Sequence, residues 1–296
     1  MENPCMSMKK ATWLTLIAAL SMTACSWEPS NVQQTVDGYL VETGRVQKGP
    51  LRRGSVVTIN ELDSQNLAPS GKSYTFETLD DRGTFMPTSK FGSPYLETTA
   101  QGYYFNEVTG KSDQWTALRG LSNLAEGADK AVNINVLSDM ISDRIRVLVR
   151  ATPTLGFTAA RAQAQRELLD AFGIFNGTDV MSDGAGQAVN FTELDLSTAR
   201  ASDQVLAAIS SLVAYVGNQR KDNGGVTPFL SEIGSDLADD GELNNSIRLD
   251  LGVKEQLQQA ALGISLGKVV ANLNRLYPNM YYVGDLSQWL DLSGGG

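Results

Sequence analysis

The chain has 296 residues, of which 24 are basic and 33 acidic, so its formal net charge is −9. An acidic chain is unsuited to nucleic acid, because that affinity depends on cations that neutralise phosphates. The absence of histidine excludes Ser-His-Asp and Cys-His catalysis as usually built, and also zinc sites that use histidine.

An apolar run follows two lysines near the start of the chain. Lys9 and Lys10 precede Ala11–Ala24, and Cys25 comes directly after. The run is too short to cross a bilayer as a helix, which takes about 20 apolar residues. A charged segment followed by a short apolar one is typical of a secretory signal, so we expect residues 1–24 to be a signal peptide. The sequence leaves three possible starts: Met1, Met6 and Met8.

The end of this run, Leu20–Cys25, resembles the signal of bacterial lipoproteins, in which a small residue precedes the cysteine that receives the lipid. The small residue is Ala24, whereas Met22 stands where that family usually has leucine. The resemblance implies that Cys25 begins the mature chain and carries acyl chains such as palmitate, which anchor it in a membrane. Ser26, in place of an aspartate, implies the outer membrane. A plain cleaved signal is the alternative.

Cleavage after residue 24 also removes Cys5, and lipid would occupy Cys25, so the mature fold is expected to have no disulfide and no free thiol. Two lysines and one glutamate leave with the signal, which makes the mature net charge −10. Residues 25–34 are polar and include one proline, and this composition predicts a tether.

Residues 35–122 predict an antiparallel β-sandwich. Short runs rich in Val, Tyr, Phe and Thr alternate with turns, at a spacing typical of sandwiches and barrels. In Ser55–Leu62, Val57 and Ile59 share one face, as they would in a half-buried strand. The other expected strands are Tyr39–Val46, Ser73–Leu79, Thr84–Met86, Tyr95–Ala100, Tyr103–Val108 and Trp115–Leu118.

Four short segments of this region resemble the transthyretin-like sandwich of carboxypeptidase-regulatory modules. They are Gly44–Pro50, Gly54–Thr58, Asp80–Phe85 and Gly102–Phe105. In that family, a strand leads through a Gly/Pro turn into a second strand, and a later Asp-x-x-Gly-x-Phe turn enters a core strand. The resemblance covers about 80 residues, and it implies a mostly non-catalytic accessory domain.

Residues 123–290 predict an α-helical domain, because the apolar period changes from two towards 3.6. The fold class is therefore α+β with two domains, followed by a flexible tail at residues 291–296. The whole arrangement is similar to bacterial lipoproteins in which such a sandwich precedes a helical domain of unassigned role. The expected helices are Val136–Val149, Thr158–Phe172, one that Ser202 caps, one that Thr227 caps and Gly241 ends, and Val253–Leu276, the longest.

The acidic turn that begins at Asp236 is similar in composition to the calcium loop of EF-hands. Counted from Asp236, positions 3 and 12 are Ala238 and Ile247, so two required acidic ligands are missing. We interpret the segment as a helix end with a glycine cap. Three aspartates stay as weak calcium candidates: Asp236, Asp239 and Asp240.

Carboxylates and aromatic residues supply the other candidate sites. A glycosidase would need two carboxylates in one cleft, and the spacing selects no pair among Glu61, Asp63, Asp80, Asp81 and Glu97. Tyr103–Phe105, and Tyr281–Tyr282 together with Trp289, are candidate aromatic platforms for sugar or peptide. In the strand expected at Tyr103–Phe105, alternate side chains point to opposite faces, so at least one face is expected to be core. Trp289, near the end of the chain, is harder to explain as core and is a weak candidate for ligand binding.

These observations predict a non-enzymatic, lipid-anchored protein of the bacterial cell envelope with a binding or scaffolding role. Its expected partners are the membrane, through acyl chains on Cys25, and an unknown envelope protein or surface ligand. We expect no cofactor, no metal, no catalytic residues and no nucleic acid. The alternatives are a surface adhesin or receptor, whose helical domain carries the recognition face, and a carbohydrate-directed hydrolase with two carboxylates.

Overall fold

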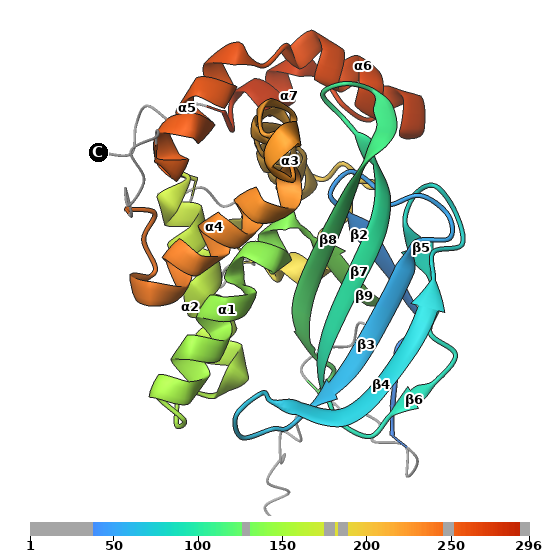
Figure 1. Cartoon of the computed structure of the whole chain (residues 1–296), viewed down its shortest axis with the longest axis vertical. Helices are drawn as coiled ribbons and strands as arrows, with labels where there is room; N and C mark the ends of the chain where they lie inside the picture. Colours follow the sequence, from blue (N-terminus) through green and yellow to red (C-terminus); the bar gives the residue numbers. More distant parts are fainter. Residues whose placement is uncertain (1–37, 126–130, 175–180, 183–188, 245–251, 291–296) are drawn as a thin grey trace, which may run out of the picture. The chain divides into compact units, whose positions relative to one another are not determined.

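The structure is a computed structural model that describes residues 38–125, 131–174, 181–182, 189–244 and 252–290 (Figure 1). The expected signal peptide at 1–24, the tether at 25–34 with Cys25, and the tail at 291–296 lie outside the described residues. Within the described part the fold is mixed α+β, as the sequence predicts, with nine β-strands and seven α-helices. Residues Val32–Gly296 belong to one compact unit.

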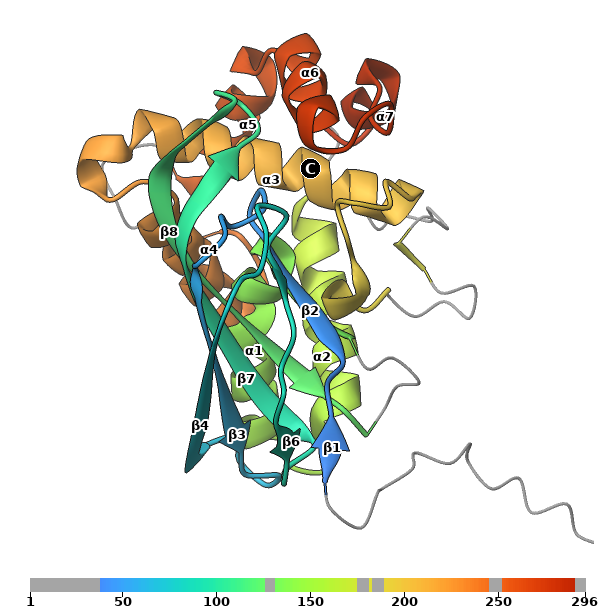
Figure 2. The same cartoon turned by 90° about the vertical axis from the view of Figure 1, so that its right-hand side faces the viewer.

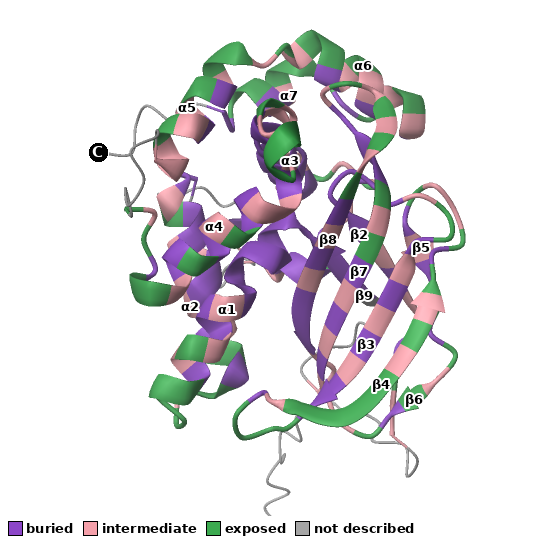
Figure 3. Ribbon diagram, in the orientation of Figure 1, coloured by how far each residue is buried: buried purple, intermediate pink, exposed green. Residues whose placement is uncertain are grey.

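The largest sheet has four antiparallel strands in the order β4-β3-β7-β8. The strands are β3 (Val56–Leu62), β4 (Pro69–Glu77), β7 (Tyr95–Asn106) and β8 (Lys111–Asn123). Buried and less buried residues alternate along most of β3 and the first half of β7, because successive side chains point to opposite faces, whereas β4 at the edge has no buried residue (Figure 3). Val57 and Ile59 are fully buried on one face, as predicted. The other face is called the outer face below.

The single strand β7 replaces the two short strands expected at Tyr95–Ala100 and Tyr103–Val108. Gly102 lies at the point where the two predictions divide, but the strand continues through it. A Cβ atom at Gly102 would lie 2.1 Å from the hydroxyl oxygen of Ser55. The glycine is therefore needed for close approach of a neighbouring segment rather than for a turn.

Two small sheets complete the β structure. One has the order β5-β2-β9, from β2 (Thr43–Gln47), β5 (Thr84–Phe85) and β9 (Ala131–Asn135). The other pairs β1 (Tyr39–Leu40) with β6 (Lys90–Phe91). The first strand expected at Tyr39–Val46 is thus divided into β1 and β2. β9 is a strand within the range expected to be helical, and it runs parallel to β2 over five residue pairs.

β9 leads directly into the first helix. Asn135, its last residue, caps the helix: its side chain accepts from the N–H groups of Leu137 and Ser138, and the Ser138 hydroxyl accepts from Asn135 N–H at 2.9 Å. This reciprocal pair is a capping box. The seven helices are α1 (Val136–Ala151), α2 (Gly156–Ala171), α3 (Ala201–Gln219), α4 (Val226–Asp240), α5 (Val253–Gly263), α6 (Leu266–Leu276) and α7 (Val283–Ser287).

The N-caps expected for α3 and α4 are each wrong by two residues. Arg200, not Ser202, is the N-cap of α3, and Asp203 accepts from its N–H at 2.9 Å. Gly225 precedes α4, and Thr227 lies inside the helix. The Thr227 hydroxyl accepts from the N–H of Ala117 at 3.1 Å, so it joins α4 to the edge of β8 instead of capping the helix.

The long helix expected at Val253–Leu276 is also wrong: it is divided into α5 and α6. Ile264, between them, has extended backbone angles (φ −76°, ψ 134°). A Cβ atom at Gly263 would lie 2.2 Å from the hydroxyl oxygen of Tyr215 on α3. The close approach of α3 to the end of α5 explains why a glycine is there. The separate helix α6 buries Val269 and Leu273.

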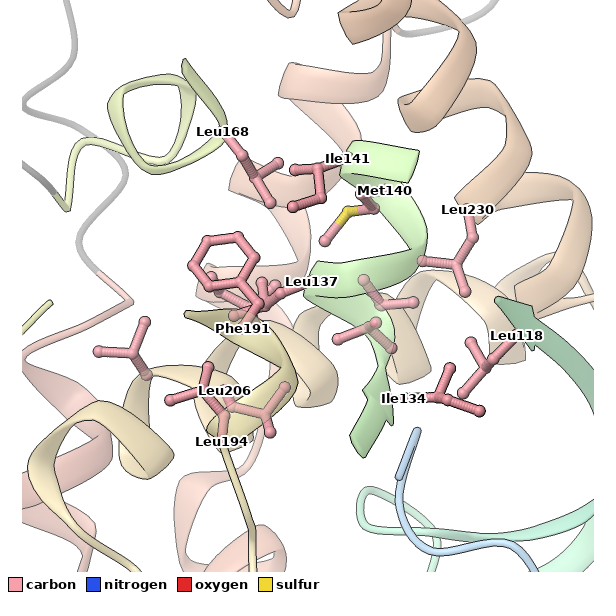
Figure 4. Close-up of a cluster of buried hydrophobic side chains, with 14 of the residues drawn as sticks. Leu118, Ile134, Leu137, Met140, Ile141, Leu168, Phe191, Leu194, Leu206 and Leu230 are labelled. Carbon is pink, nitrogen blue, oxygen red and sulfur yellow. The ribbon is translucent and has the colours of Figure 1, made fainter. Parts of the chain in front are cut away.

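A continuous hydrophobic core joins the sheets to the helices (Figure 4). In the close-up, Leu137, Met140 and Ile141 of α1 lie among Leu168 of α2 and Leu230 of α4. Figures 1 and 2 show α1 and α4 beside β8 and α3 across the end of the sheet, and α1 contacts α2, α4 and β8. Among the described residues, no helix is long and apolar enough to cross a membrane.

Candidate functional site

Three aspartates considered as weak calcium ligands lie at the end of α4: Asp236, Asp239 and Asp240. Gly241 ends the helix with φ of 91°, as expected for a glycine cap. The guanidinium of Arg144 donates to carbonyl oxygens of this turn at 3.1 and 3.4 Å and pairs with Glu167 at 2.7 Å. A cation therefore already occupies this helix end. The described residues contain no cluster of three or more His, Cys, Asp or Glu that could hold a metal ion.

The five carboxylates considered for hydrolysis are held in turns and ion pairs. Glu61 accepts from the Tyr74 hydroxyl at 3.0 Å and from Gly92 N–H at 2.7 Å, and Glu97 pairs with Arg146 at 2.5 Å. Burial opposes ionisation of Asp80, but hydrogen bonds from Thr84 and Arg82 hold its pKa below the usual value. Asp63 accepts from two N–H groups of its own loop, and Asp81 pairs with Arg52.

Most of the aromatic residues considered as platforms are buried. Tyr104 and Tyr281 are fully buried, and burial raises the pKa of both phenols. Trp289 is 9% exposed and belongs to the hydrophobic core. Its indole N–H is buried without a hydrogen-bond partner. The side chain of Trp289 thus forms part of the core rather than an exposed platform.

A buried ion pair lies where the turn after β2 meets α3. The Lys48 ammonium is 2.9 Å from Glu107 and 3.3 Å from the hydroxyl oxygen of Ser210, and it lies over the ring of Tyr104. Ser210 is also 2.6 Å from Glu107. Burial lowers the pKa of Lys48, and the charge of Glu107 opposes this effect only in part. The second carboxylate oxygen of Glu107 is buried without a hydrogen-bond partner.

An amide network continues from this pair towards the β7–β8 hairpin. The Tyr104 hydroxyl donates to Gln114 at 2.5 Å, and the Asn106 amide donates to Gln114 and to Asn218 of α3 at 3.0 and 3.1 Å. A lysine beside a serine is a known means of activating a serine nucleophile. Here both side chains are almost fully buried (Lys48 0%, Ser210 1% exposed), so the geometry supports a structural link between hairpin and helix.

A second buried carboxyl group lies where α1 meets β8. Asp139 is 9% exposed and accepts from the N–H of Arg119 at 2.7 Å, while the Arg119 guanidinium pairs with Asp143. Burial raises the pKa of Asp139 to about 7, although the nearby charge of Arg119 opposes the shift. The sequence does not predict this buried carboxyl group, because nothing in the spacing of acidic residues distinguishes Asp139 from exposed ones.

The exposed candidate site is a row of three side chains across the outer face of the sheet. Tyr103 of β7 is directly opposite Trp115 of β8. On the other side of Tyr103, Arg52 donates its N–H to the Tyr103 carbonyl at 2.8 Å, next to the bridge between Leu51 and Tyr104. Residues directly opposite each other share a face of the sheet, so Arg52, Tyr103 and Trp115 form one row. We call these three residues the aromatic row.

The aromatic row is open to solvent. Tyr103 is 57% and Trp115 47% exposed, although both are large apolar side chains. Arg52 pairs with Asp81 at 3.0 Å, and both of these side chains are also nearly half exposed. Such a surface offers ring faces for stacking and a charged pair for hydrogen bonding.

Sequence reasoning found one member of the aromatic row and missed the others. Tyr103 was considered as a platform, whereas Trp115 was only part of an expected strand. No local signal marks the pair, because the register of β7 and β8 shifts by one residue between the Asn106–Lys111 and Tyr104–Gln114 pairs, and only this shift places residue 103 opposite residue 115. Comparisons with protein families, with curated proteins and with solved structures found no match.

Proposed function

We propose that this protein is a non-enzymatic, lipid-anchored component of the bacterial outer membrane with a binding or scaffolding role. The observation that carries the proposal is the order of residues in Lys9–Cys25: two lysines, a short apolar run, Ala24 and Cys25. Acyl chains on Cys25 would supply the membrane affinity that an acidic chain lacks.

We also propose that the β-rich half is a module of the transthyretin-like type. The four antiparallel strands support this, as does the turn at residues 80–83 that leads into β5. The parallel pairing of β2 with β9 departs from a module that would end before residue 123. As an accessory module, it would present a surface to a partner, and the aromatic row is the exposed surface best suited to that role.

A surface adhesin or receptor is the second candidate function. Three apolar side chains around the segment between α6 and α7 are exposed: Met280 at 36%, Tyr282 at 60% and Val283 at 45%. Exposed apolar residues that lie close together are typical of recognition surfaces. In this version of the proposal, the recognition face lies on the helical half.

The lipid anchor is tested by changing its attachment site. Cells that produce the wild-type chain or Cys25→Ser are labelled with radioactive palmitate and then separated into membrane and soluble fractions. We expect label and membrane association for the wild type, and loss of both for C25S. A variant that stays in the membrane fraction as a mature, labelled chain would show that the anchor is elsewhere. Cys5→Ser is the matched control and should behave like the wild type.

Protease treatment of intact cells tests which side of the membrane the protein faces. Degradation without lysis would favour the adhesin or receptor, because the domains must then be outside. Protection until lysis would favour a periplasmic scaffold, for which crosslinking would identify the envelope partner.

A further inference from the structure

The two rings of the aromatic row are exposed, whereas other large aromatic side chains of this chain are buried in the core. Tyr104, next to Tyr103 in the sequence, is fully buried, and Tyr281 is buried in the same way. A cross-strand aromatic pair stabilises a sheet by only about 0.2–1 kcal/mol relative to alanine. Sheet stability alone therefore gives a weak reason for placing a tryptophan opposite a tyrosine on a solvent-facing surface.

The ionic groups next to the aromatic row are a paired guanidinium and an exposed acid. Arg52 pairs with Asp81 at 3.0 Å. Asp113, two residues before Trp115 on β8 and therefore on the same face, is exposed. A surface with one paired guanidinium and an exposed carboxylate suits an uncharged polar ligand better than a polyanion, and the net charge of −9 disfavours nucleic acid further.

A neutral carbohydrate matches this combination of groups. The C–H faces of pyranose rings are apolar and stack on aromatic rings, while their hydroxyl groups need donors and acceptors at the rim. Tyr103 and Trp115 are opposite each other on adjacent strands, and both side chains are exposed. Arg52 supplies donors, and Asp81 supplies an acceptor.

We propose that the aromatic row is a carbohydrate-binding platform, on which Tyr103 and Trp115 stack against a neutral oligosaccharide and the Arg52–Asp81 pair bonds its hydroxyl groups. The inference rests on the proposed binding function, and it gives that function a ligand class. It requires no chemical step, only a complex of modest affinity.

The test measures binding of defined sugars to the purified full chain in a detergent without a sugar head group. The probes are tetrasaccharides of glucose and of N-acetylglucosamine, titrated to about 10 mM and followed by calorimetry and tryptophan fluorescence. We expect at least one to bind saturably. Tyr103→Thr and Trp115→Thr, which replace the rings with a residue that still favours strands, should each weaken binding by roughly five- to tenfold.

Leu262→Thr on α5 is the control, because it removes an exposed apolar side chain (90%) that lies in neither candidate surface, and its affinity should equal that of the wild type. Circular dichroism and thermal unfolding of each variant separate lost binding from lost folding. Arg52→Lys, which keeps the charge but not the planar donor fork, should weaken binding less than Trp115→Thr does.

Three results would overturn the inference: no saturable binding of either tetrasaccharide, equal binding by folded Y103T and W115T, or binding of single-stranded oligothymidylate in place of the sugars. None of them bears on the anchor. If the chain binds no sugar but takes up palmitate at Cys25, the result supports the lipid anchor and contradicts the carbohydrate platform. If the chain is not lipidated but binds sugar through the aromatic row, the result supports the platform and contradicts the anchor.

Discussion

Lys48 and Glu107 illustrate how two buried charges depend on each other. Both side chains are nearly inaccessible (0% and 2% exposed), and their charged groups are 2.9 Å apart. Desolvation opposes both charges, and the attraction between them offsets this penalty only while both are present. The unpartnered second oxygen of Glu107 makes the pair less than fully satisfied.

We therefore expect Lys48→Met to lower the free energy of unfolding by about 3–5 kcal/mol, because Glu107 is left buried without its partner. The double variant Lys48→Met/Glu107→Leu should lose much less than the sum of the two single variants. Urea unfolding of the four proteins gives the coupling energy directly. Additive losses would mean that the two groups do not interact as an ion pair.

The stability of the fold should depend on pH through Asp139, because burial raises the pKa of this carboxyl group to about 7 from the usual 3.8. The folded state then binds a proton that the unfolded state has already released. Its contribution to stability is fully present below about pH 4 and is lost as the pH rises to about 7, with a slope of at most about 1.4 kcal/mol per pH unit.

Asp139→Asn should remove this slope, since the amide oxygen can still accept from Arg119 N–H and has no charge to desolvate. Urea unfolding of wild type and D139N between pH 4 and pH 8 measures the difference, and D139N should gain relative to the wild type as the pH rises. Parallel pH profiles for the two proteins would contradict the raised pKa.

At the scale of elements, helix ends are held together by side chains from other helices. Arg144 of α1 donates to the last carbonyl oxygens of α4, while Glu167 of α2 holds the same guanidinium. One residue thus satisfies acceptors that have no partner within α4 and also connects three helices. The planar fork of arginine suits this task, because its donors can reach several acceptors at once.

Arg144→Ala should lower the free energy of unfolding by roughly 3–5 kcal/mol, because it leaves Glu167 without its cationic partner, with only the Gln163 amide as a donor, and removes the donor from the end of α4. Arg144→Lys should recover only part of this loss. Arg150→Ala, at the exposed end of α1, is the control and should stay within about 0.5 kcal/mol of the wild type. Equal stability of R144A and R150A would show that Arg144 has no such role.

At the scale of the whole molecule, the β-rich and helical parts share a sheet and a core. β9 pairs with β2 over five residue pairs, and Asn135 at its end caps α1. The link between the two parts is also polar: Gln47 of β2 donates to Asp195 and accepts from Leu196 N–H, each at 3.0 Å.

A fragment of residues 35–122 should therefore fail to fold alone. It lacks β9 and the helices that cover Leu118, so it would expose an unpaired strand edge and apolar surface. A proton–nitrogen NMR spectrum of the fragment should show the narrow dispersion of an unfolded chain, while residues 35–290 should be well dispersed. A well-dispersed spectrum for 35–122 would establish it as an independent domain.

Local patterns were sufficient to predict several elements. The apolar stripe at Val136–Val149 predicted α1 almost to its ends, and Gly241 was correctly read as the end of α4. Alternation also identified Val57 and Ile59 as core residues of β3. These features could be predicted because helix periodicity, strand alternation and a glycine cap depend on residues a few positions apart.

The tertiary structure decided the features that depend on distant residues. The long helix expected at Val253–Leu276 is divided where Tyr215 of α3 approaches Gly263, and Trp289, near the end of the chain, is part of the hydrophobic core. β9 is a strand because β2 pairs with it, and Trp115 becomes part of the aromatic row only because the β7–β8 register places it opposite Tyr103. The sequence by itself predicted a location for the protein, from the signal at its start, and most of its local helices and strands. Strand pairing and helix packing join residues that are far apart in the sequence, and they decided which side chains remain exposed as a possible binding surface.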